Sequence, residues 1–301
     1  MPEMPEVETI ARGLNRKIKN RKIMDIWTDW PRYSSLRKRV VGKKITGVTR
    51  RGKNVLIHLS GNHLLLIHQK MSGHLMVGKW KPKSELTASQ IADLPEGWRE
   101  QKWIPVPPRG PLTDPMNRFI RLIFFLDNGE MFALSDLRRF AKVLCAPERE
   151  ILNLPEIKKL GPEPLDKKFN FRKFEELFRG RKGRIKQVLM DQNFITGIGN
   201  IYADEILWLA KIHPTARIET LNERALKVIY GSMRKILGKA LRLRGTSIDD
   251  YRDSGGERGG YDLTRYVYQR EGEPCKRCGT EIKRLKLGGR SAHYCPKCQK
   301  I

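Results

Sequence analysis

The sequence predicts an α+β protein of several domains: an N-terminal β-sandwich flanked by a helix, a helical domain, and a small C-terminal finger that binds a metal. Three observations support this. Short strand-like runs joined by turn residues occupy positions 22–145, helical periodicity replaces them from about position 147, and two cysteine pairs follow near the C-terminus. We place the boundaries at 1–147 for the sandwich domain, 148–165 for a linker, 166–268 for the helical domain and 269–301 for the finger.

The chain opens with a predicted helix whose apolar residues recur at helical spacing, namely Val7, Ile10, Leu14 and Ile18. Pro5 suits the first helical position, and acidic residues suit the first turn. The same segment also contains a candidate nucleophile. If Met1 is removed, Pro2 becomes a free secondary amine beside the Glu3 carboxylate, and an α-amine that titrates near neutrality is a ready nucleophile. These residues alone leave both interpretations open, a plain helix start and a nucleophile.

Strands are predicted from alternating apolar patterns and from the turns between them. The Asn128-Gly129 pair is a strong hairpin signal, and successive hairpins favour an antiparallel sandwich. A proline-rich stretch at about 79–117 cannot hold a central strand, so we interpret it as a long surface insertion. The predicted strands are residues 45–51, 55–59, 63–68, 119–126 and 131–134.

The helical domain is predicted from apolar periodicity in residues 171–178 and 185–189 and from a long run at 221–243. The glycine-rich turn at 196–200 leads into a helix that we expect Asn200 to cap. Such a turn before a helix N-terminus suits a DNA phosphate, although a tight interhelical turn explains the glycines equally well. We expect the Gly-rich, charged segment 253–260 to be mobile without a ligand.

The charge points to a polyanionic partner, because 60 Lys and Arg against 33 Asp and Glu give +27. Nucleic acid is favoured over a membrane, since the basic residues are spread along the chain and no apolar run approaches ~18 residues. The acidic, proline-bearing N-terminus does not resemble a secretory signal. We therefore expect a cytoplasmic protein.

Four of the five cysteines form two Cys-x-x-Cys pairs separated by 16 residues, Cys275 with Cys278 and Cys295 with Cys298. Together they can close a tetrahedron around Zn²⁺ and leave no open coordination position, so we expect one structural zinc ion per chain. A disulfide framework is the alternative, but it does not suit the cytosol. Cys145 stands alone in an apolar context, where a buried free thiol is expected.

Three separated motifs make the chain resemble the formamidopyrimidine-DNA glycosylase (MutM) family, which is related to endonuclease VIII. They are Pro2-Glu3-Met4-Pro5-Glu6, Gly197-Ile198-Gly199-Asn200-Ile201-Tyr202, and the finger from Gly272-Glu273-Pro274-Cys275 to Cys298. The resemblance covers nearly the whole chain. It implies a helix-two-turn-helix motif in the helical domain and a β-hairpin zinc finger.

The resemblance also implies a bifunctional enzyme that excises oxidised purines from duplex DNA and then cleaves the abasic site by β,δ-elimination. Pro2 would attack the sugar C1′ and Glu3 would exchange protons. Lys53, at a predicted hairpin tip, matches a lysine that contacts phosphate and assists elimination, although a solvated turn lysine is the alternative. Arg290 matches the finger arginine that grips the phosphates of the lesion.

The same resemblance assigns DNA contacts. Met71, Arg138 and Phe140 match a trio that fills the hole left by the expelled base, with core packing as the alternative for Met71 and Phe140. The expected partner is double-stranded DNA that contains oxidised purines or abasic sites, bound by a monomer in a prokaryotic, nucleoid-associated setting. The other residues that fall where the family contacts DNA or lesion are His68, Arg118, Lys182, Lys186 and Asn200.

The chain departs from the family pattern at several places. Leu137 and Ala141 replace a proline and a glycine, Asn117-Arg118 replaces a His-containing contact, and the insertion is longer than usual. These changes bear on lesion preference, so an oxidised-pyrimidine glycosylase of the endonuclease VIII branch stays open. A non-catalytic damaged-DNA-binding protein is the second alternative, and it is disfavoured because Pro2 and Glu3 are both present.

Overall fold

The computed structural model describes residues 1–248 and 250–300. They form two compact units. The first comprises Met1–Lys158 together with Arg244–Gly260, and the second comprises Lys159–Leu243 and the chain from Tyr261 onward. Residues 244–260, which the sequence assigned to the helical domain, thus group with the sandwich.

The first unit is a sandwich of two four-stranded antiparallel sheets, as predicted, with strand orders β1-β8-β9-β5 and β10-β4-β3-β2. Side chains from both sheets share one buried core, in which Ile57 and Leu65 of one sheet lie with Phe124 and Leu134 of the other. The strands are β1 Ile23–Thr28, β2 Ile45–Arg51, β3 Asn54–Leu59, β4 His63–His68, β5 Gly73–Gly78, β8 Ile120–Leu126, β9 Met131–Asp136 and β10 Lys142–Pro147.

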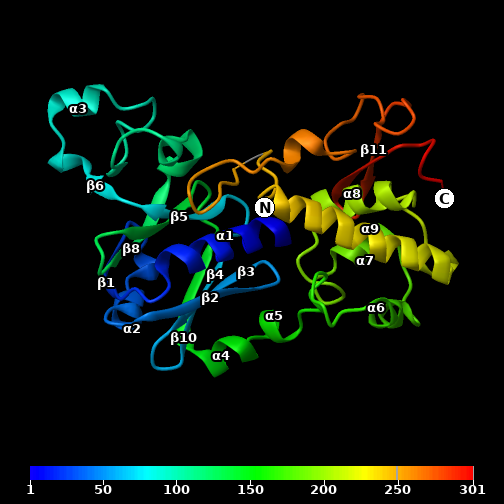
Figure 1. Ribbon diagram of the computed structural model, residues 1–301, viewed down its shortest axis with the longest axis horizontal. Coiled ribbons are helices and arrows are strands. Elements are labelled where there is room, and N and C mark those ends of the chain that lie inside the picture. The colour runs from blue at the N-terminus through cyan, green and yellow to red at the C-terminus, as the bar shows by residue number, and fades with distance from the viewer. Residues whose placement is uncertain (249, 301) are drawn as a thin grey trace. The chain divides into compact units, whose positions relative to one another are not determined.

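Helix α1 (Met4–Ile18) lies along β2 and β3 (Figure 1). Its predicted apolar stripe is fully buried in the sandwich core, which explains why this short segment is helical: packing of one face, rather than propensity, stabilises it. The remaining short helices of the sandwich are η1 Pro31–Tyr33, α2 Leu36–Val40, α4 Glu148–Asn153 and α5 Pro155–Lys158.

The insertion between β5 and β8 is folded rather than a plain surface loop. Trp98 is buried with Leu94 and Ile104 in a small core of its own, and Trp80 packs against the outer face of the β8–β9 sheet. Figure 1 draws it in cyan at the upper left. Its elements are β6 Trp80–Pro82, η2 Lys83–Glu85, α3 Ala88–Ala92, β7 Trp103–Pro105, η3 Pro111–Thr113 and η4 Pro115–Arg118.

The second unit is helical and ends in a β-hairpin. Helix α8 contacts α7, α9 and strand β12, and Figure 1 shows α7, α8 and α9 together. Among the described residues, no helix combines the length and apolar character needed to cross a membrane. The elements are α6 Phe171–Phe178, α7 Ile185–Met190, α8 Asn200–Ala210, η5 Ile218–Thr220, α9 Glu223–Arg242, η6 Tyr261–Thr264, β11 Lys283–Leu287 and β12 Arg290–Tyr294.

One local prediction for these helices is wrong. Gly199, not Asn200, is the N-cap of α8, because the glycine adopts the extended backbone that a cap requires (φ −133°, ψ −154°) and Asn200 is already helical. The segment 253–260, expected to be mobile without a ligand, is partly buried: Asp253 and Ser254 are buried, and the Asp253 carboxylate accepts hydrogen bonds from the backbone N–H groups of Gly255 and Glu257.

Candidate functional site

Pro2 and Glu3 are buried, and a reciprocal capping arrangement holds the backbone of Glu3. Pro2 is buried, and Glu3, only 3% exposed, is the N-cap residue of α1. Its backbone N–H donates to Oε2 of Glu6 at 2.9 Å, while Oε1 of Glu6 accepts the N–H of Thr246 at 2.7 Å. One buried carboxylate therefore fixes the backbone next to Pro2.

Lys53 lies in the turn between β2 and β3, and that turn is tied to α1. The Arg50 guanidinium pairs with Glu8 at 2.7 Å and donates to the carbonyl oxygen of Gly52 at 2.8 Å. Burial acts to raise the pKa of Glu8, but the adjacent Arg50 and Arg12 guanidinium groups outweigh it and lower the pKa below its ordinary value. Lys53 is 7% exposed, so it is not the solvated turn lysine of the alternative interpretation.

His68 ends strand β4 near Lys53. Burial, reinforced by the charges of Lys70 and Lys53, lowers its pKa to about 4, so the imidazole is neutral at pH 7. The backbone N–H of Lys70 donates to Nδ1 at 3.0 Å, which leaves the proton on Nε2. His68 can therefore offer a neutral hydrogen-bond donor, but not a cation, to a phosphate.

Met71 and the residues 138–140 are brought together by one buried aspartate. Asp136 accepts the Ser72 hydroxyl at 2.6 Å and the backbone N–H of Ala141 at 2.8 Å, and Ser72 in turn accepts the N–H of Arg138 at 3.0 Å. Met71 and Phe140 are 37% and 56% exposed. Exposure of this size rules out core packing and leaves two large apolar side chains free to act on a partner.

In the second unit, the glycine turn before α8 is fastened by Gln192. Its side chain accepts the N–H of Gly197 at 2.9 Å and donates to the carbonyl oxygen of Ile198 at 2.7 Å. The turn thus delivers its backbone to the N-terminal end of α8. Within the described part of the chain, the side-chain oxygen of Asn200 has no hydrogen-bond partner.

The hairpin that carries Arg290 is held by a buried ion pair. Nζ of Lys186 lies 2.7 Å from Oδ1 of Asp204, and both side chains are almost fully buried. Lys186 also donates to the carbonyl oxygen of Ser291 at 2.6 Å, and Asp204 accepts the backbone N–H of His293 at 2.9 Å. Arg290 itself is exposed at the start of β12. Lys186 therefore supports the hairpin, and its enclosed ammonium group does not fit the predicted contact with DNA.

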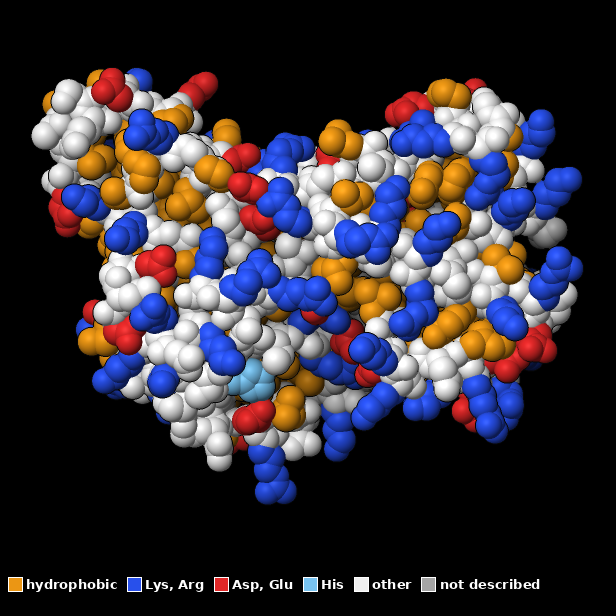
Figure 2. Space-filling view, in the orientation of Figure 1, with side chains coloured by type: hydrophobic (Ala, Val, Ile, Leu, Met, Phe, Trp, Pro, Cys, Tyr) orange, Lys and Arg blue, Asp and Glu red, His pale blue; other side chains and the backbone are white. Residues whose placement is uncertain are grey.

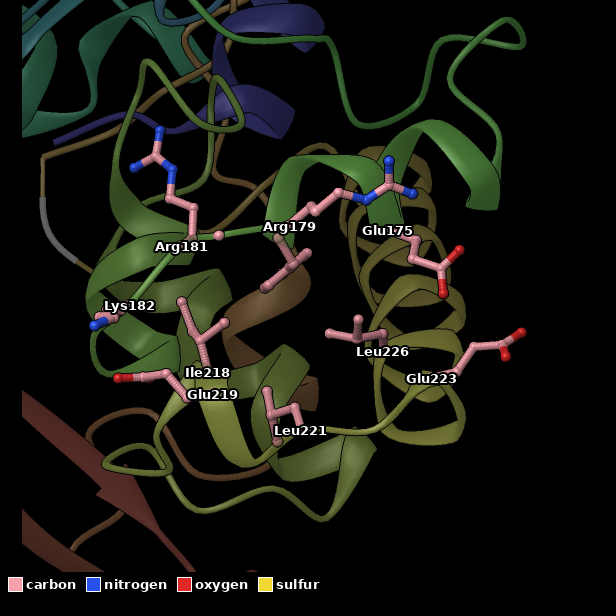
Figure 3. Close-up of a pocket in the computed structure, with 11 residues that line it drawn as sticks. Glu175, Arg179, Arg181, Lys182, Ile218, Glu219, Leu221, Glu223 and Leu226 are labelled. Carbon is pink, nitrogen blue, oxygen red and sulfur yellow. The ribbon is translucent and has the colours of Figure 1, made fainter.

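A hollow of about 560 Å³ lies beside α6, η5 and the start of α9. Figure 3 shows Ile218, Leu221 and Leu226 pointing into it, with Lys182 at its edge. The residues that line it include none of the predicted catalytic residues. The basic residues Arg179, Arg181 and Lys182 line the hollow together with the acidic residues Glu175, Glu219 and Glu223, so its rim carries both charges and Lys182 is exposed at its edge.

Four cysteines form the metal centre. The Sγ atoms of Cys275, Cys278, Cys295 and Cys298 all lie within 4.8 Å of one another. Backbone N–H groups of Arg277 and Cys298 and the indole of Trp208 point at the sulfur atoms, as donors that stabilise thiolates. With four sulfur ligands and no open position, the site fits a structural Zn²⁺.

Known proteins of one family match this chain over its full length. Residues 1–143 match the formamidopyrimidine-DNA glycosylase N-terminal domain, 160–252 the H2TH domain of the same enzyme, and 272–301 the zinc finger found in FPG and IleRS. The formamidopyrimidine-DNA glycosylase of Pelotomaculum thermopropionicum is 37% identical, with 100% of both chains covered. That of Desulforamulus reducens is 36% identical over 100% of this chain and 99% of its own.

Solved structures give the same result. The Lactococcus lactis Fpg (MutM) in complex with DNA containing N7-benzyl-Fapy-dG is similar with a TM-score of 0.81, 32% identity and full coverage of both chains. The chain belongs to the formamidopyrimidine-DNA glycosylase family. A structure of MutM with DNA containing carbocyclic 8-oxo-G matches with a TM-score of 0.80 and 32% identity.

The predicted site residues of this glycosylase are divided between the two units. Pro2, Glu3, Lys53, His68 and the exposed trio lie in the first unit, and Arg290, Asn200 and Lys182 lie in the second. Arg118 is less available than predicted, because its guanidinium packs over the Phe119 ring at 4.6 Å and against Gly97 inside the insertion. On the face drawn in Figure 2, Lys and Arg side chains are widely spread, which matches the charge of +27.

The sequence did not reveal the buried acids that hold these residues, namely Glu6, Asp136, Asp204 and Glu205. Glu205 is fully buried, which raises its pKa, and it accepts the Tyr261 hydroxyl and the backbone N–H of Val267 at 2.8 Å. One signal was available: two adjacent acids, Asp204 and Glu205, interrupt the otherwise apolar run of α8. Charged residues on a buried helix face require internal partners.

Proposed function

We propose that this protein removes oxidised purines, such as 8-oxoguanine and formamidopyrimidines, from duplex DNA and cleaves the abasic site that results. The observation that carries the proposal is the buried Pro2-Glu3 start of α1, fixed by Glu6. It is supported by family membership and by related structures, in which Fpg and MutM proteins hold DNA with Fapy-dG, 8-oxo-G or an abasic site.

The chemistry begins at the Pro2 nitrogen, which must first be freed by removal of Met1. Its lone pair attacks C1′, the bond from C1′ to the base breaks, and the base leaves with a proton. Opening of the sugar ring then gives an iminium between C1′ and Pro2. The iminium draws electrons from C2′, so that loss of a C2′ proton expels the 3′ phosphate and a second elimination expels the 5′ phosphate. Water finally releases the enzyme from the sugar fragment.

The other residues act around that nitrogen. Glu3 exchanges protons during base expulsion and elimination. Lys53 and Arg290 bind the phosphates on either side of the lesion, aided by His68, Lys182 and Asn200. Met71, Arg138 and Phe140 occupy the gap in the stack, where an aromatic wedge and a flexible thioether replace the lost contacts and the arginine bonds the unpaired base.

The zinc finger supplies position rather than chemistry. One Zn²⁺ per chain holds the hairpin, and with it Arg290, in shape. We further propose that the enzyme works in the bacterial cytoplasm, on chromosomal DNA, as a monomer.

An oxidised-pyrimidine glycosylase of the endonuclease VIII branch is the nearest alternative. The DNA lesions named for the related structures, Fapy-dG and 8-oxo-G, are purines and favour the first proposal. Duplexes that carry either 8-oxoguanine or an oxidised pyrimidine separate the two, because the proposal requires faster excision of the purine.

Borohydride trapping tests the mechanism. Reduction of the iminium in a mixture of enzyme and 8-oxoguanine duplex should join protein and DNA covalently, and a peptide map should place the adduct on Pro2. An intact mass that lacks Met1 is a precondition. Base release without any trapped adduct contradicts the Schiff-base mechanism, and Glu3→Gln, which cannot exchange a proton, should bind the lesion but release no base.

A further inference from the structure

The last part of the insertion contacts residues 252–256, a segment far away in sequence. Asp114 Oδ1 lies 2.9 Å from Nη2 of Arg252, which is only 3% exposed. Asn117 is fully buried, and its side-chain nitrogen donates to the carbonyl oxygen of Gly256 at 3.1 Å and to that of Pro111 at 2.8 Å. The insertion thus holds this segment with one ion pair, in which the guanidinium group is buried, and with one buried amide.

His74 sets the orientation of that amide. Its Nε2 lies 2.8 Å from Oδ1 of Asn117, and burial lowers its pKa and favours the neutral imidazole. Because the amide nitrogen faces two carbonyl groups, the amide oxygen faces His74 and accepts the proton on Nε2. Gly256 fits closely against the amide: its φ is +85°, and a Cβ there would lie 2.8 Å from the Asn117 nitrogen and 2.9 Å from the Pro111 oxygen.

The other side of the segment lies on the sandwich and on α1. The carbonyl oxygen of Ser254 accepts the N–H of Val77 at 2.9 Å, on the edge strand β5, and Nζ of Lys17 at 3.3 Å. A Cβ on Gly13 of α1 would lie 1.9 Å from the Ser254 hydroxyl oxygen, so a larger residue at position 13 would displace that side chain. Residues 252–256 are therefore enclosed between the insertion and α1.

Residues 245–247, which precede this segment, reach the catalytic N-terminus through Glu6, and the Ser247 hydroxyl ties them to the segment by donating to the carbonyl oxygen of Tyr251 at 2.7 Å. The N–H of Thr246 donates to Oε1 of Glu6, whose Oε2 accepts the N–H of Glu3. A Cβ on Gly245 would lie 2.7 Å from Oε1, so the backbone approaches the carboxylate as closely as it can. Any release of this stretch alters the partner that orients Glu6, and Glu6 fixes the residue next to Pro2.

We propose that the end of the insertion, residues 111–117, is a clamp that holds residues 252–256 against α1, with Asp114 and Asn117 as positioning residues for base excision. The effect of the clamp on base excision rests on the proposed function, whereas the clamp contact itself does not. The clamp acts through Glu6 on Glu3, the group that exchanges a proton when the base leaves. Cleavage of a preformed abasic site needs no base expulsion, so it depends less on the clamp.

Two variants open the clamp with little change in volume. Asn117→Asp keeps the acceptor for His74 but sets a carboxylate oxygen against two carbonyl groups. Asp114→Asn keeps the oxygen that accepts the N–H of Met116 and loses the charge opposite Arg252. Asp93→Asn, an exposed change in the same insertion, is the matched control. If Asn117→Asp fails to fold, Asp114→Asn carries the test alone.

Amide hydrogen exchange of residues 250–258, measured without DNA, tests whether the clamp holds this segment in place. Loss of one buried bond worth about 1–2 kcal/mol should raise exchange there by about tenfold, while the sheets keep their protection and Asp93→Asn behaves like the parent. Unchanged exchange in both variants overturns the clamp, whatever the enzyme does. This readout needs no substrate, so it stands apart from the trapping experiment that tests the function.

Single-turnover and steady-state kinetics test whether the clamp contributes to base excision. On an 8-oxoguanine duplex, kcat should fall by about tenfold with little change in KM, and cleavage of an abasic duplex should fall by less than about threefold. Raised exchange with equal losses on both duplexes, or with no loss on either, overturns the positioning role. A purely structural support would lower thermal stability and leave the ratio of the two activities unchanged.

Discussion

Each unit fixes exposed, functional side chains with one buried aspartate, but the two aspartates have different partners. In the sandwich, Asp136 accepts two neutral donors, the Ser72 hydroxyl and the Ala141 N–H, and holds the loop of Met71, Arg138 and Phe140. In the helical unit, Asp204 faces the ammonium of Lys186 and holds the hairpin of Arg290.

The difference predicts different tolerance to change. A carboxylate satisfied by neutral donors loses one hydrogen bond when one donor is removed. A carboxylate that shares a buried site with a cation becomes an unpaired buried charge when the cation is removed, which is far more costly. The hairpin has a second dependence that the sandwich loop lacks, because the finger also needs its metal.

Zinc removal should have the largest effect. Binding of a structural Zn²⁺ to four thiolates is worth about 10–16 kcal/mol in small fingers, and that energy is folding energy. Chelation should therefore unfold the finger, release Arg290 and weaken DNA binding, while the sandwich keeps its cooperative unfolding transition. Hydrogen exchange resolved by region checks both halves. Equal loss of protection in both units would break the comparison.

Lys186→Met should come next, with a loss of about 3–5 kcal/mol in unfolding free energy, because Asp204 is left buried without its cation. The matched control is Lys182→Met, the same change at an exposed site, which should stay within about 0.5 kcal/mol. Adding Asp204→Asn to Lys186→Met should recover part of the loss. Denaturant unfolding of the zinc-loaded proteins measures all three, and equal effects of the two lysine changes would show that the ion pair contributes nothing.

Ser72→Ala should cost less, about 1–3 kcal/mol, since Asp136 keeps the N–H of Ala141 while the Arg138 N–H loses its acceptor. Exposed Ser84→Ala is the control. A loss as large as that of Lys186→Met would show that the two aspartates are equivalent after all.

The sequence predicted the helices and strands better than it predicted the buried aspartates that hold the functional side chains. Hairpin turns and strand patterns placed β4 at its observed bounds, and the stripe from Val7 to Ile18 gave α1, because local periodicity records which face is buried. The cysteine spacing predicted the metal centre, since two Cys-x-x-Cys pairs can supply all four ligands of a tetrahedral zinc site.

The rest depends on contacts between residues far apart in the chain. Nothing local marks Asp136 or Glu6 as the partner of a distant N–H group, and the buried state of Lys186 follows from Asp204 and Ser291 around it. The segment 253–260 was predicted to be mobile without a ligand because loops rich in Gly and charged residues usually are solvated. No short pattern predicts the fold of the insertion, whose residues Asp114 and Asn117 contact Arg252 and Gly256.

A smaller effect should appear with pH in the sandwich. The pKa of His68 is about 4 in the folded protein, because burial and then Lys70 and Lys53 lower it, against about 6.5 for an unfolded histidine. The unfolded state binds the proton first, so this contribution is present above pH 6.5 and is lost as the pH falls toward 4. The difference in unfolding free energy between the parent and His68→Asn, measured from pH 7.5 to pH 4, should shrink with acidity; a constant difference would contradict the shift.

The smallest change in stability should come from the exposed trio itself, although its effect on activity is large. Met71→Ala and Phe140→Ala remove side chains that are 37% and 56% exposed, so unfolding free energy should change by no more than about 0.5 kcal/mol, as for the exposed control Leu152→Ala. Excision from an 8-oxoguanine duplex should nevertheless fall, because the flipped state loses the side chains that fill the stack. An abasic duplex has already lost the pairing and stacking of the missing base, worth a few kcal/mol, so its cleavage should survive better. Equal losses on both duplexes would mean that these side chains serve general DNA binding, and a loss of stability would mean that Asp136 holds a part of the core rather than a wedge.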